Sequence, residues 1–289
     1  MKEIVKEKIA SLLSGGEEIQ SVEQLGGMTN QNYLVKTSSN QYIVKFFGKG
    51  TDKLIDRQNE KFNLELLKDL KLDVENYLFD IDAGIKVNQY IENAETLDST
   101  TIKTKFEKIA PILQTIHASG KELKGEFAPF EEIKKYESLI QGEISYPNYE
   151  VVRKSVFSLK DQLEEIGMDK KSCHIDLVPE NFIEGPDGHL YLIDWEYSSM
   201  NDPMWDLAAL FLESEFTSAE EEEFLSLYES DKTPVSREKI RIYKILQDII
   251  WSLWTIYKEE NGADFGDYGI SRYNRAVKEL DCEGDLDEN

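Results

Sequence analysis

Apolar and polar residues alternate in short runs over the first third of the chain, a period of two that predicts β-strands. The clearest runs are EIQSVEQL (18–25), NYLVKT (32–37) and QYIVKF (41–46). The tripeptide SSN at 38–40 separates the last two runs and predicts a hairpin. A second hairpin is expected from NYLFDI and IKVNQYI, with its turn at Asp82, Ala83 and Gly84. The N-terminal part is therefore interpreted as a small β-rich lobe.

Helical spacing of apolar residues replaces this alternation in the rest of the chain. One charged amphipathic helix is expected between the two hairpins, at 52–70. Four later helices are expected. The first starts near residue 101, and Pro111 should kink it or mark its true start. The others are one over 147–167, one that begins with a Ser218–Glu221 capping box, and one over 237–258. The last is almost entirely apolar in its second half, which predicts that it is buried.

The two patterns divide the chain into two parts. A small β-rich lobe is expected over residues 1–91, and a larger, mainly helical lobe over residues 92–289. A short connector near 89–96 joins them. The expected fold class is therefore α+β, with two lobes.

Composition and charge exclude several classes of protein. The 289 residues are 40% hydrophobic and 31% charged, which is typical of a globular chain. The formal net charge of −24 argues against nucleic acid or anionic lipid as partners and weakly favours a small cationic one. No stretch approaches the roughly 20 apolar residues of a membrane span, and Cys173 and Cys282 form no disulfide framework. We expect a cytoplasmic protein without nucleic acid or membrane partners; the oligomeric state is left open.

The segment CHIDLVPENFIEGPDGHLYLIDWE, residues 173–196, concentrates the candidate chemistry. Asp176 and Asn181 are five residues apart, and Asp194 follows a turn and a short strand. Phosphoryl transfer needs such a set: one carboxylate to accept the proton of the attacking hydroxyl, and an amide and a second carboxylate to hold Mg²⁺ against the phosphates. The H-x-D-x-x-x-x-N spacing is that of a kinase catalytic loop. Taken alone, Asp176 and Asp194 are more simply interpreted as loop-capping residues.

Two residues of the N-terminal lobe favour the catalytic interpretation. Lys45 stands in the third strand, where a kinase keeps the lysine that binds phosphates. Glu60, on the helix that follows, is the expected ion-pair partner of Lys45. Either residue alone would be ordinary surface charge, but the ordered set is much harder to obtain by chance.

The segment LGGMTNQNYLV, residues 25–35, precedes Lys45 and is the candidate phosphate loop. It lacks the G-x-G-x-x-G pattern, although Gly26 and Gly27 permit a tight turn. The loop residues expected to meet the nucleotide are Met28, Thr29, Asn30 and Asn32. Without the downstream set, an ordinary polar hairpin would explain this loop equally well.

The motifs HIDLVPENF and YLIDWEYSSMNDPMWDLA resemble the catalytic and metal motifs of the choline/ethanolamine kinase family, and of bacterial choline kinases in particular. The resemblance implies a bilobal kinase-like fold, and transfer of the γ-phosphate of ATP to the hydroxyl of choline with Mg²⁺ as the metal. By motif, Asp176 matches the catalytic base, Asn181 and Asp194 the metal ligands, and Asp206 the residue that steadies the catalytic loop. The adenine would be held at NQYI (88–91), through residues Gln89 and Ile91.

A third matching segment, IIWSLWTIYK at 249–258, bears on the cation of the substrate. A quaternary ammonium has no N–H to donate, so aromatic faces must hold it. Trp251 and Trp254 are three residues apart and share a helix face, although two tryptophans on an apolar helix are otherwise core residues. The other residues expected at the choline site are Tyr197, Tyr268 and Glu196, of which Glu196 could support the cation or only the fold.

Three further residues near these motifs are assigned structural roles. His174 is expected to brace the catalytic loop rather than act as a base, and His117 to serve at a helix end. Cys173 is expected to be buried and inert.

Two kinds of alternative function stay open. One is another kinase of the same fold, acting on ethanolamine, thiamine or an aminoglycoside. Ethanolamine would favour carboxylates over aromatic rings, and an aminoglycoside would need an open acidic cleft, against which the tryptophan pair counts. The other is a catalytically dead kinase-like binding module, against which the intact Lys45, Asp176 and Asp194 argue.

Overall fold

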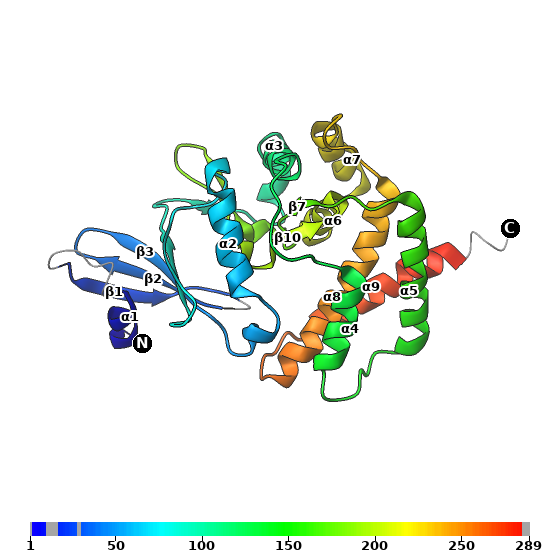
Figure 1. The fold of residues 1–289 in the computed structure, drawn as a ribbon, viewed down its shortest axis with the longest axis horizontal. Coiled ribbons are helices and arrows are strands. Elements are labelled where there is room, and N and C mark those ends of the chain that lie inside the picture. The colour runs from blue at the N-terminus through cyan, green and yellow to red at the C-terminus, as the bar shows by residue number, and fades with distance from the viewer. Residues whose placement is uncertain (1, 10–16, 28–29, 285–289) are drawn as a thin grey trace. The chain divides into compact units, whose positions relative to one another are not determined.

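The structure, a computed structural model, describes residues 2–9, 17–27 and 30–284 and divides into two compact units (Figure 1). The small unit consists of Met1–Asp98 and Pro179–Tyr197, and the large unit consists of Ser99–Val178 and Ser198–Asn289. Most strands belong to the small unit and most helices to the large one. The expected α+β class is therefore confirmed.

The segment Pro179–Tyr197 joins the small unit although it lies far along the chain. Its strand β8 (Phe182–Glu184) pairs antiparallel with β6 (Glu95–Thr96), and β9 (Leu190–Leu192) pairs with β8. A single cut after residue 91 does not describe this arrangement, because pairing returns a later segment to the earlier part of the chain. Both candidate metal ligands, Asn181 just before β8 and Asp194 just after β9, therefore belong to the small unit.

A five-stranded antiparallel sheet forms the core of the small unit, in the order β1-β2-β3-β5-β4. The strands are β1 (Ile19–Gln24), β2 (Gln31–Thr37), β3 (Gln41–Phe46), β4 (Asn76–Asp80) and β5 (Ile85–Gln89). Both predicted hairpins are confirmed. At the second turn Gly84 has a φ of 67°, which glycine adopts without steric cost. Val35 and Val44 are fully buried together with Val5 of helix α1 (Lys2–Ile9).

Helix α2 (Arg57–Leu67) begins later than the apolar pattern predicts. The predicted range 52–70 contains a 3₁₀ turn at Thr51–Lys53, then α2, then a second 3₁₀ turn at Lys68–Leu70. Asp56 starts the helix proper, because its carboxylate accepts two backbone N–H groups of the first turn at 2.9 and 3.1 Å. The cap makes Arg57 the first residue of α2.

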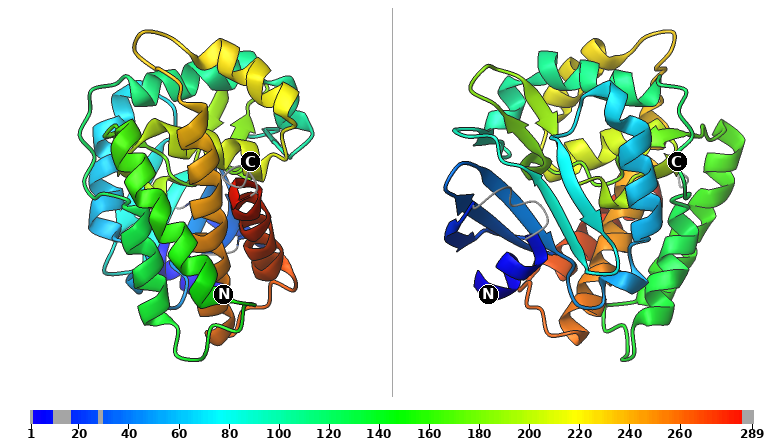
Figure 2. Two further views of the ribbon diagram at one scale, coloured as in Figure 1. Left: turned by 90° about the vertical axis from the view of Figure 1, so that its right-hand side faces the viewer. Right: turned by 60° about the vertical axis from the view of Figure 1, so that its left-hand side comes forward.

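Helix α8 (Arg237–Glu260) lies at the centre of the large unit, as its apolar second half predicts. The helices that pack against it are α4 (Pro129–Leu139), α5 (Tyr149–Ile166), α6 (Pro203–Glu213) and α9 (Tyr268–Gly284), of which α4 and α5 are seen beside it in Figure 2. The remaining elements are the 3₁₀ turn Thr101–Thr104, α3 (Phe106–His117), α7 (Ser218–Tyr228) and the antiparallel pair β7 (Lys171–Cys173) and β10 (Ser199–Asn201).

Two expectations for the large unit need correction. Pro111 lies inside α3 and does not mark its start; Ile109 and Leu113 beside it are fully buried, which stabilises the helix against the missing N–H. The capping box is formed by Thr217 and Glu220, one residue before the predicted pair. Helices α4 and α9 were not predicted.

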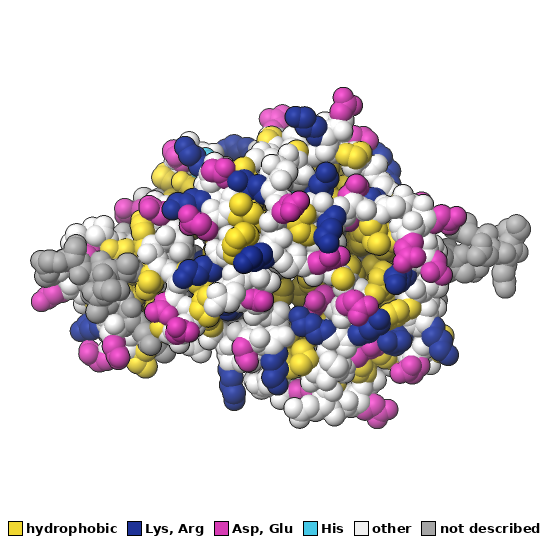
Figure 3. All heavy atoms as spheres, in the orientation of Figure 1, with side chains coloured by type: hydrophobic (Ala, Val, Ile, Leu, Met, Phe, Trp, Pro, Cys, Tyr) yellow, Lys and Arg dark blue, Asp and Glu magenta, His cyan; other side chains and the backbone are white. Residues whose placement is uncertain are grey.

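Charged side chains of both signs are interspersed over the face shown in Figure 3, although the chain as a whole carries a net charge of −24. On this face the acidic groups are spread over many elements, so solvation accounts for them without a dedicated acidic site. Among the helices of the described ranges, none has the length and apolar character needed to cross a membrane.

Candidate functional site

Lys45 and Asp194 form a short ion pair in the small unit, with Lys45 Nζ 2.6 Å from Asp194 Oδ1. Lys45 projects from β3 and is only 6% exposed, whereas the Asp194 side chain is 26% exposed. Burial by itself would lower the pKa of Lys45, but the carboxylates of Asp194 and Glu196 outweigh it and raise that pKa. The lysine is therefore a fixed cation beside a carboxylate that solvent still reaches.

The two predicted metal ligands are brought together by the end of the β8–β9 hairpin. The N–H of Ile193, the neighbour of Asp194, donates to the carbonyl of Asn181 at 2.8 Å. Asp194 adopts a left-handed φ of 68°, which aspartate tolerates better than most residues. A carboxylate and an amide oxygen are suitable ligands for Mg²⁺, which takes few protein ligands. The side chains of Asn181 and Asp194, at the end of the β8–β9 hairpin, therefore offer oxygen ligands that fit the expected metal.

Glu60 does not form the predicted ion pair with Lys45. Its carboxylate lies 2.6 Å from Arg57 Nη1 and 3.0 Å from Lys86 Nζ, and it is 1% exposed. Lys86 stands directly opposite Lys45 on the neighbouring strand β5, so two lysines compete for the glutamate at this level of the sheet. Burial raises the pKa of Glu60, but Lys86 and Arg57 overcome this and lower it. Glu60 therefore affects Lys45 only electrostatically, by helping to raise its pKa, and not through a direct ion pair.

The candidate phosphate loop is held by its own asparagines. Asn32 Nδ2 donates to Gly26 O at 2.9 Å, and Asn30 Oδ1 accepts the N–H of Gly48 at 3.3 Å. A Cβ at Gly27 would lie 2.6 Å from Asn30 O, so only glycine fits there. Met28 and Thr29 lie outside the described residues.

Glu196 belongs to the small unit and is 6% exposed. Its Oε2 accepts from Asn30 Nδ2 at 2.7 Å and lies 2.9 Å from Arg57 Nη1. Burial and then the nearby Asp194 carboxylate raise the pKa of Glu196, against the opposing effect of Lys45 and Arg57. Of the two roles left open by the sequence, these contacts favour support of the fold.

The predicted adenine-binding segment lies at the end of β5. The N–H of Gln89 donates to Glu75 O at 2.8 Å, so this donor already serves the sheet. Ile91 packs near the β8–β9 turn, its Cγ2 3.6 Å from the position of a Cβ at Gly185. Contact of Gln89 and Ile91 with adenine stays a prediction.

In the large unit, the loop that carries Asp176 is fixed from behind by Asp206. The two carboxylate oxygens of Asp206 accept the backbone N–H groups of His174 and Ile175, each at 2.8 Å. Ile175 has a left-handed φ of 79°, which is unusual for a β-branched residue. Trp205 Nε1 donates to Ile175 O at 3.0 Å. Asp206 thus has the geometry expected of the residue that steadies this loop.

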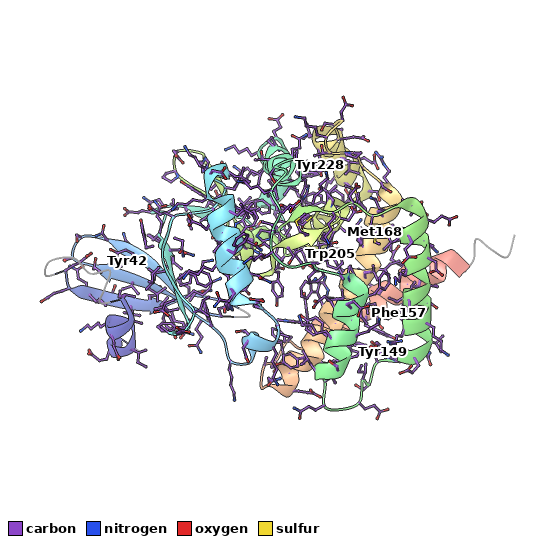
Figure 4. The ribbon with its side chains drawn as sticks, viewed as in Figure 1. Tyr42, Tyr149, Phe157, Met168, Trp205 and Tyr228 are labelled. Carbon is purple, nitrogen blue, oxygen red and sulfur yellow. The ribbon has the colours of Figure 1, made fainter. Side chains whose placement is uncertain are left out.

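His117 extends this support to the rest of the large unit. It is the last residue of α3, as expected, and its two ring nitrogens lie 3.1 Å from Asp206 Oδ2 and 2.7 Å from the hydroxyl of Tyr228. Tyr228 and Trp205, labelled in Figure 4, come from α7 and α6 and are fully buried. Cys173 is buried too, and burial raises the pKa of its thiol, in agreement with an inert role.

A row of aromatic rings follows α8 and the start of α9. The ring centroids of Trp251 and Trp254 are 6.5 Å apart, those of Trp254 and Phe265 are 5.0 Å apart, and those of Phe265 and Tyr268 are 6.5 Å apart. The sequence reasoning missed Phe265, although it lies in the segment around Tyr268. The indole N–H of Trp254 is buried and finds no hydrogen-bond partner within the described ranges. We call these four residues the aromatic row.

Tyr268 connects the aromatic row to the loop of Asp176. Burial first, and then Glu213 and Asp176, raise its pKa to about 12, against the opposing effect of Arg272. The Asp176 carboxylate is therefore within electrostatic range of the Tyr268 hydroxyl. Tyr197, by contrast, belongs to the small unit, so its role beside the tryptophans stays a prediction.

The sequence reasoning missed two buried charged residues, Arg272 beside the aromatic row and Asp73 in the small unit. Arg272 is 4% exposed; it donates to the Tyr268 hydroxyl at 2.8 Å and forms ion pairs with Glu213 at 2.6 Å and Asp248 at 3.2 Å. In the small unit, burial raises the pKa of Asp73 to about 6, against Lys86. Nothing in the local sequence pattern distinguishes these residues from surface charges.

The buried lysine–carboxylate pair, the oxygen ligands of the turn and the braced loop define the class, a phosphotransferase with a kinase-like fold. A family model for choline/ethanolamine kinase matches residues 22–239. The chain therefore belongs to the choline/ethanolamine kinase family.

Solved structures and a characterised relative agree with this assignment. The crystal structure of choline kinase LicA from Streptococcus pneumoniae is 77% identical, covers 98% of this chain and 99% of that chain, and has a TM-score of 0.95. A crystal structure of LicA in complex with AMP is 78% identical, covers 97% and 98%, and has a TM-score of 0.93. Protein LicA of Haemophilus influenzae is 32% identical over 269 residues, 89% of this chain and 79% of that protein. The expected kinase-like fold is thereby confirmed.

Proposed function

We propose that this chain is an ATP-dependent choline kinase, which transfers the γ-phosphate of ATP to the hydroxyl of choline to give phosphocholine and ADP. The observation that carries the proposal is the Lys45–Asp194 ion pair of 2.6 Å, beside the end of the β8–β9 hairpin where the N–H of Ile193 bonds to Asn181 O. The likeness to choline kinase LicA at 77% identity supports choline as the acceptor.

Each polar residue of the site has a proposed task. Asp176 orients the choline hydroxyl and accepts its proton, and Asp206 holds the loop in which Asp176 stands. Asn181 and Asp194 hold Mg²⁺, which when bound neutralises the charge of the phosphates. Lys45 binds the phosphates through a side chain that projects from β3 and is held by its ion pair with Asp194.

The nucleotide is proposed to lie along the small unit. The loop residues Met28, Thr29, Asn30 and Asn32 meet the phosphates, and Gln89 and Ile91 meet the adenine. The existence of an AMP complex of LicA, 78% identical to this chain, supports a nucleotide site of this kind. This assigns nucleotide binding to residues 1–91 and catalysis with substrate binding to 92–289, although the metal ligands Asn181 and Asp194 of the second range belong to the small unit.

The aromatic row supports choline rather than ethanolamine as the substrate. The trimethylammonium group has no N–H, and the faces of Trp251, Trp254 and Tyr268 attract it as a desolvated cation. Tyr197 stays a predicted choline residue, whereas the contacts of Glu196 with Asn30 and Arg57 favour its role in supporting the fold. The nearby carboxylate Glu213 is already occupied by Arg272, which leaves less for a primary ammonium to bind.

A substrate panel tests the proposal directly. ADP release with Mg²⁺ and ATP is measured for choline, ethanolamine, thiamine and an aminoglycoside, and the product is identified by phosphorus NMR. We expect choline to give the highest kcat/KM and a phosphocholine signal, and no turnover without Mg²⁺. A higher kcat/KM for ethanolamine would replace choline as the substrate, and ATP binding without any turnover would identify a catalytically dead module.

The setting of the enzyme follows from its composition. We propose a cytoplasmic location, since the two cysteines form no framework and the net charge is −24. The same charge opposes nucleic acid and anionic lipid as partners. The small cationic substrate is the partner that the charge favours.

A further inference from the structure

Arg57 joins three segments of the small unit that are distant in sequence. It is the first residue of α2 and is 7% exposed. Its Nη1 lies 2.6 Å from Glu60 and 2.9 Å from Glu196, and its Nη2 donates to Asn30 Oδ1 at 3.0 Å. The guanidinium also lies over the ring of Phe47, 4.1 Å from its centroid. These contacts together fix the position and orientation of the Arg57 guanidinium.

Two of these contacts form a closed triangle with functional segments. Asn30 belongs to the candidate phosphate loop, and Glu196 stands two residues after Asp194 in the turn that follows β9, residues 193–197, which we call the metal turn. Asn30 Nδ2 also donates to Glu196 Oε2 at 2.7 Å, so the loop and the turn are bonded to each other and to Arg57. A shift of the guanidinium would therefore move both segments at once.

The charges around Arg57 give it a second effect. Glu60 has another cation, Lys86 at 3.0 Å, but Arg57 is the cation in direct contact with Glu196. Lys45 lies within electrostatic range of both Asp194 and Glu196. If Glu196 lost its cation, it would compete with Asp194 for the lysine.

We propose that Arg57 is a positioning residue for phosphoryl transfer, although it touches neither substrate nor metal. It aligns the phosphate loop with the metal turn through Asn30 and Glu196. By neutralising Glu196 it also leaves Lys45 to Asp194 and the phosphates. This inference rests on the proposed function for its reaction, but the nucleotide site that it concerns can be measured without an acceptor.

The test compares two buried cations that share Glu60. Arg57→Gln removes the contacts to the loop and the turn, whereas the matched control Lys86→Gln removes the ion pair with Glu60 and the position over the Phe79 ring, neither of which involves the loop or the turn. We expect Arg57→Gln to weaken MgATP binding, measured by calorimetry without acceptor, and to raise the KM for MgATP, each on the order of tenfold or more, as for loss of a charged hydrogen bond. The KM for choline should stay constant. Lys86→Gln should lower the melting temperature but change MgATP binding less than about threefold.

Two further variants keep the test decisive if Arg57→Gln folds poorly. Arg57→Lys retains the charge without the planar fork, so its MgATP affinity should lie between those of the wild type and Arg57→Gln. Arg57→Gln/Glu196→Gln leaves no lone buried carboxylate, and it should bind MgATP better than Arg57→Gln. Equal effects of Arg57→Gln and Lys86→Gln on MgATP affinity, or additive losses in the double variant, would overturn the proposal. If the wild-type protein binds MgATP but does not phosphorylate choline, the proposed function is refuted. The role of Arg57 in the MgATP site would not be affected by that result.

Discussion

The small and large units bury their candidate chemistry in different ways. In the small unit, cations and carboxylates are in direct contact, as in the pairs Lys45–Asp194 and Arg57–Glu196. In the large unit, the centre of the candidate substrate region is a row of rings, Trp251, Trp254, Phe265 and Tyr268, with charged groups behind it.

The difference fits the proposed function, in which the small unit binds nucleotide and the large unit binds choline. A polyphosphate is recognised by fixed cations and a metal, and in the absence of nucleotide those cations need internal carboxylates to remain buried. A quaternary ammonium needs faces without competing hydrogen bonds. Changes in the small unit should therefore act on nucleotide and phosphoryl transfer, and changes in the aromatic row should act on choline alone.

The largest effect is expected from Asp194→Asn in the small unit. It removes the charged metal ligand and leaves Lys45 buried without its carboxylate, so turnover should fall below detection in an ADP-release assay. Circular dichroism should show a folded chain. The same substitution at Asp187, in the exposed β8–β9 turn, should leave turnover intact. Substantial choline phosphorylation by Asp194→Asn would contradict its metal role.

Asp176→Asn should have the next largest effect. If the carboxylate accepts the hydroxyl proton, kcat should fall by about 10²–10⁴ while the KM for ATP stays constant, because Asp176 does not hold nucleotide. Steady-state kinetics with either substrate varied measures both. Asp161→Asn, on the exposed side of α5, serves as the control. A variant that keeps half of the wild-type kcat would exclude Asp176 from the mechanism.

Trp254→Ala tests the aromatic row against the view that these rings are only core. Loss of one cation–π contact, roughly 2 kcal/mol, should raise the choline KM on the order of 30-fold and leave the ATP KM unchanged. Trp254→Phe keeps an aromatic face and loses no hydrogen bond, since the indole N–H has no partner in the described part of the chain, so its choline KM should change much less. A wild-type choline KM in folded Trp254→Ala would identify the ring as core.

The smallest effect is expected from Tyr268→Phe, which keeps the ring and removes the hydroxyl bonded to Arg272. Stability should fall by about 1 kcal/mol near neutral pH, as measured by urea unfolding. The pKa of Tyr268 is raised from the ordinary 10.0 to about 12, so from pH 10 to 12 the unfolded chain ionises while the folded chain does not. The wild type should therefore lose stability as pH rises through this window, and Tyr268→Phe should lose less. Parallel pH curves for the two proteins would show that this group does not titrate as proposed.

The sequence predicted the elements whose patterns are local. Both hairpins and the buried helix α8 followed from periodicity alone, since each period of apolar residues reports one buried face. The start of α2 was missed because the apolar pattern already begins before Asp56. The Asp56 cap fixes where the helix starts but does not change that pattern. Helix α4 was missed because no motif drew attention to its segment, and α9 was missed because its first residue, Tyr268, was considered only as an aromatic ring and not for helical spacing.

Charged partners could not be predicted from the sequence. Lys45 and Glu60 were paired by analogy, but Lys86 lies opposite Lys45 across the sheet and takes the glutamate, a competition that only strand register reveals. Arg57 and Arg272 were missed for the same reason, because an arginine on a helix is ordinary until its distant partners are known. Asp206 was assigned correctly through its motif, which specifies the loop as well as the residue.

The return of Pro179–Tyr197 to the small unit has a consequence for how the chain is made. A ribosome releases residues 1–98 long before this segment, so the nascent sheet contains Lys45 while Asp194 does not yet exist; Arg57 has Glu60 but not yet Glu196. A buried cation without its carboxylate is strongly unfavourable. The emerging sheet must therefore keep Lys45 hydrated, and the last turn of the small unit to be synthesised is the one that allows its interior to close.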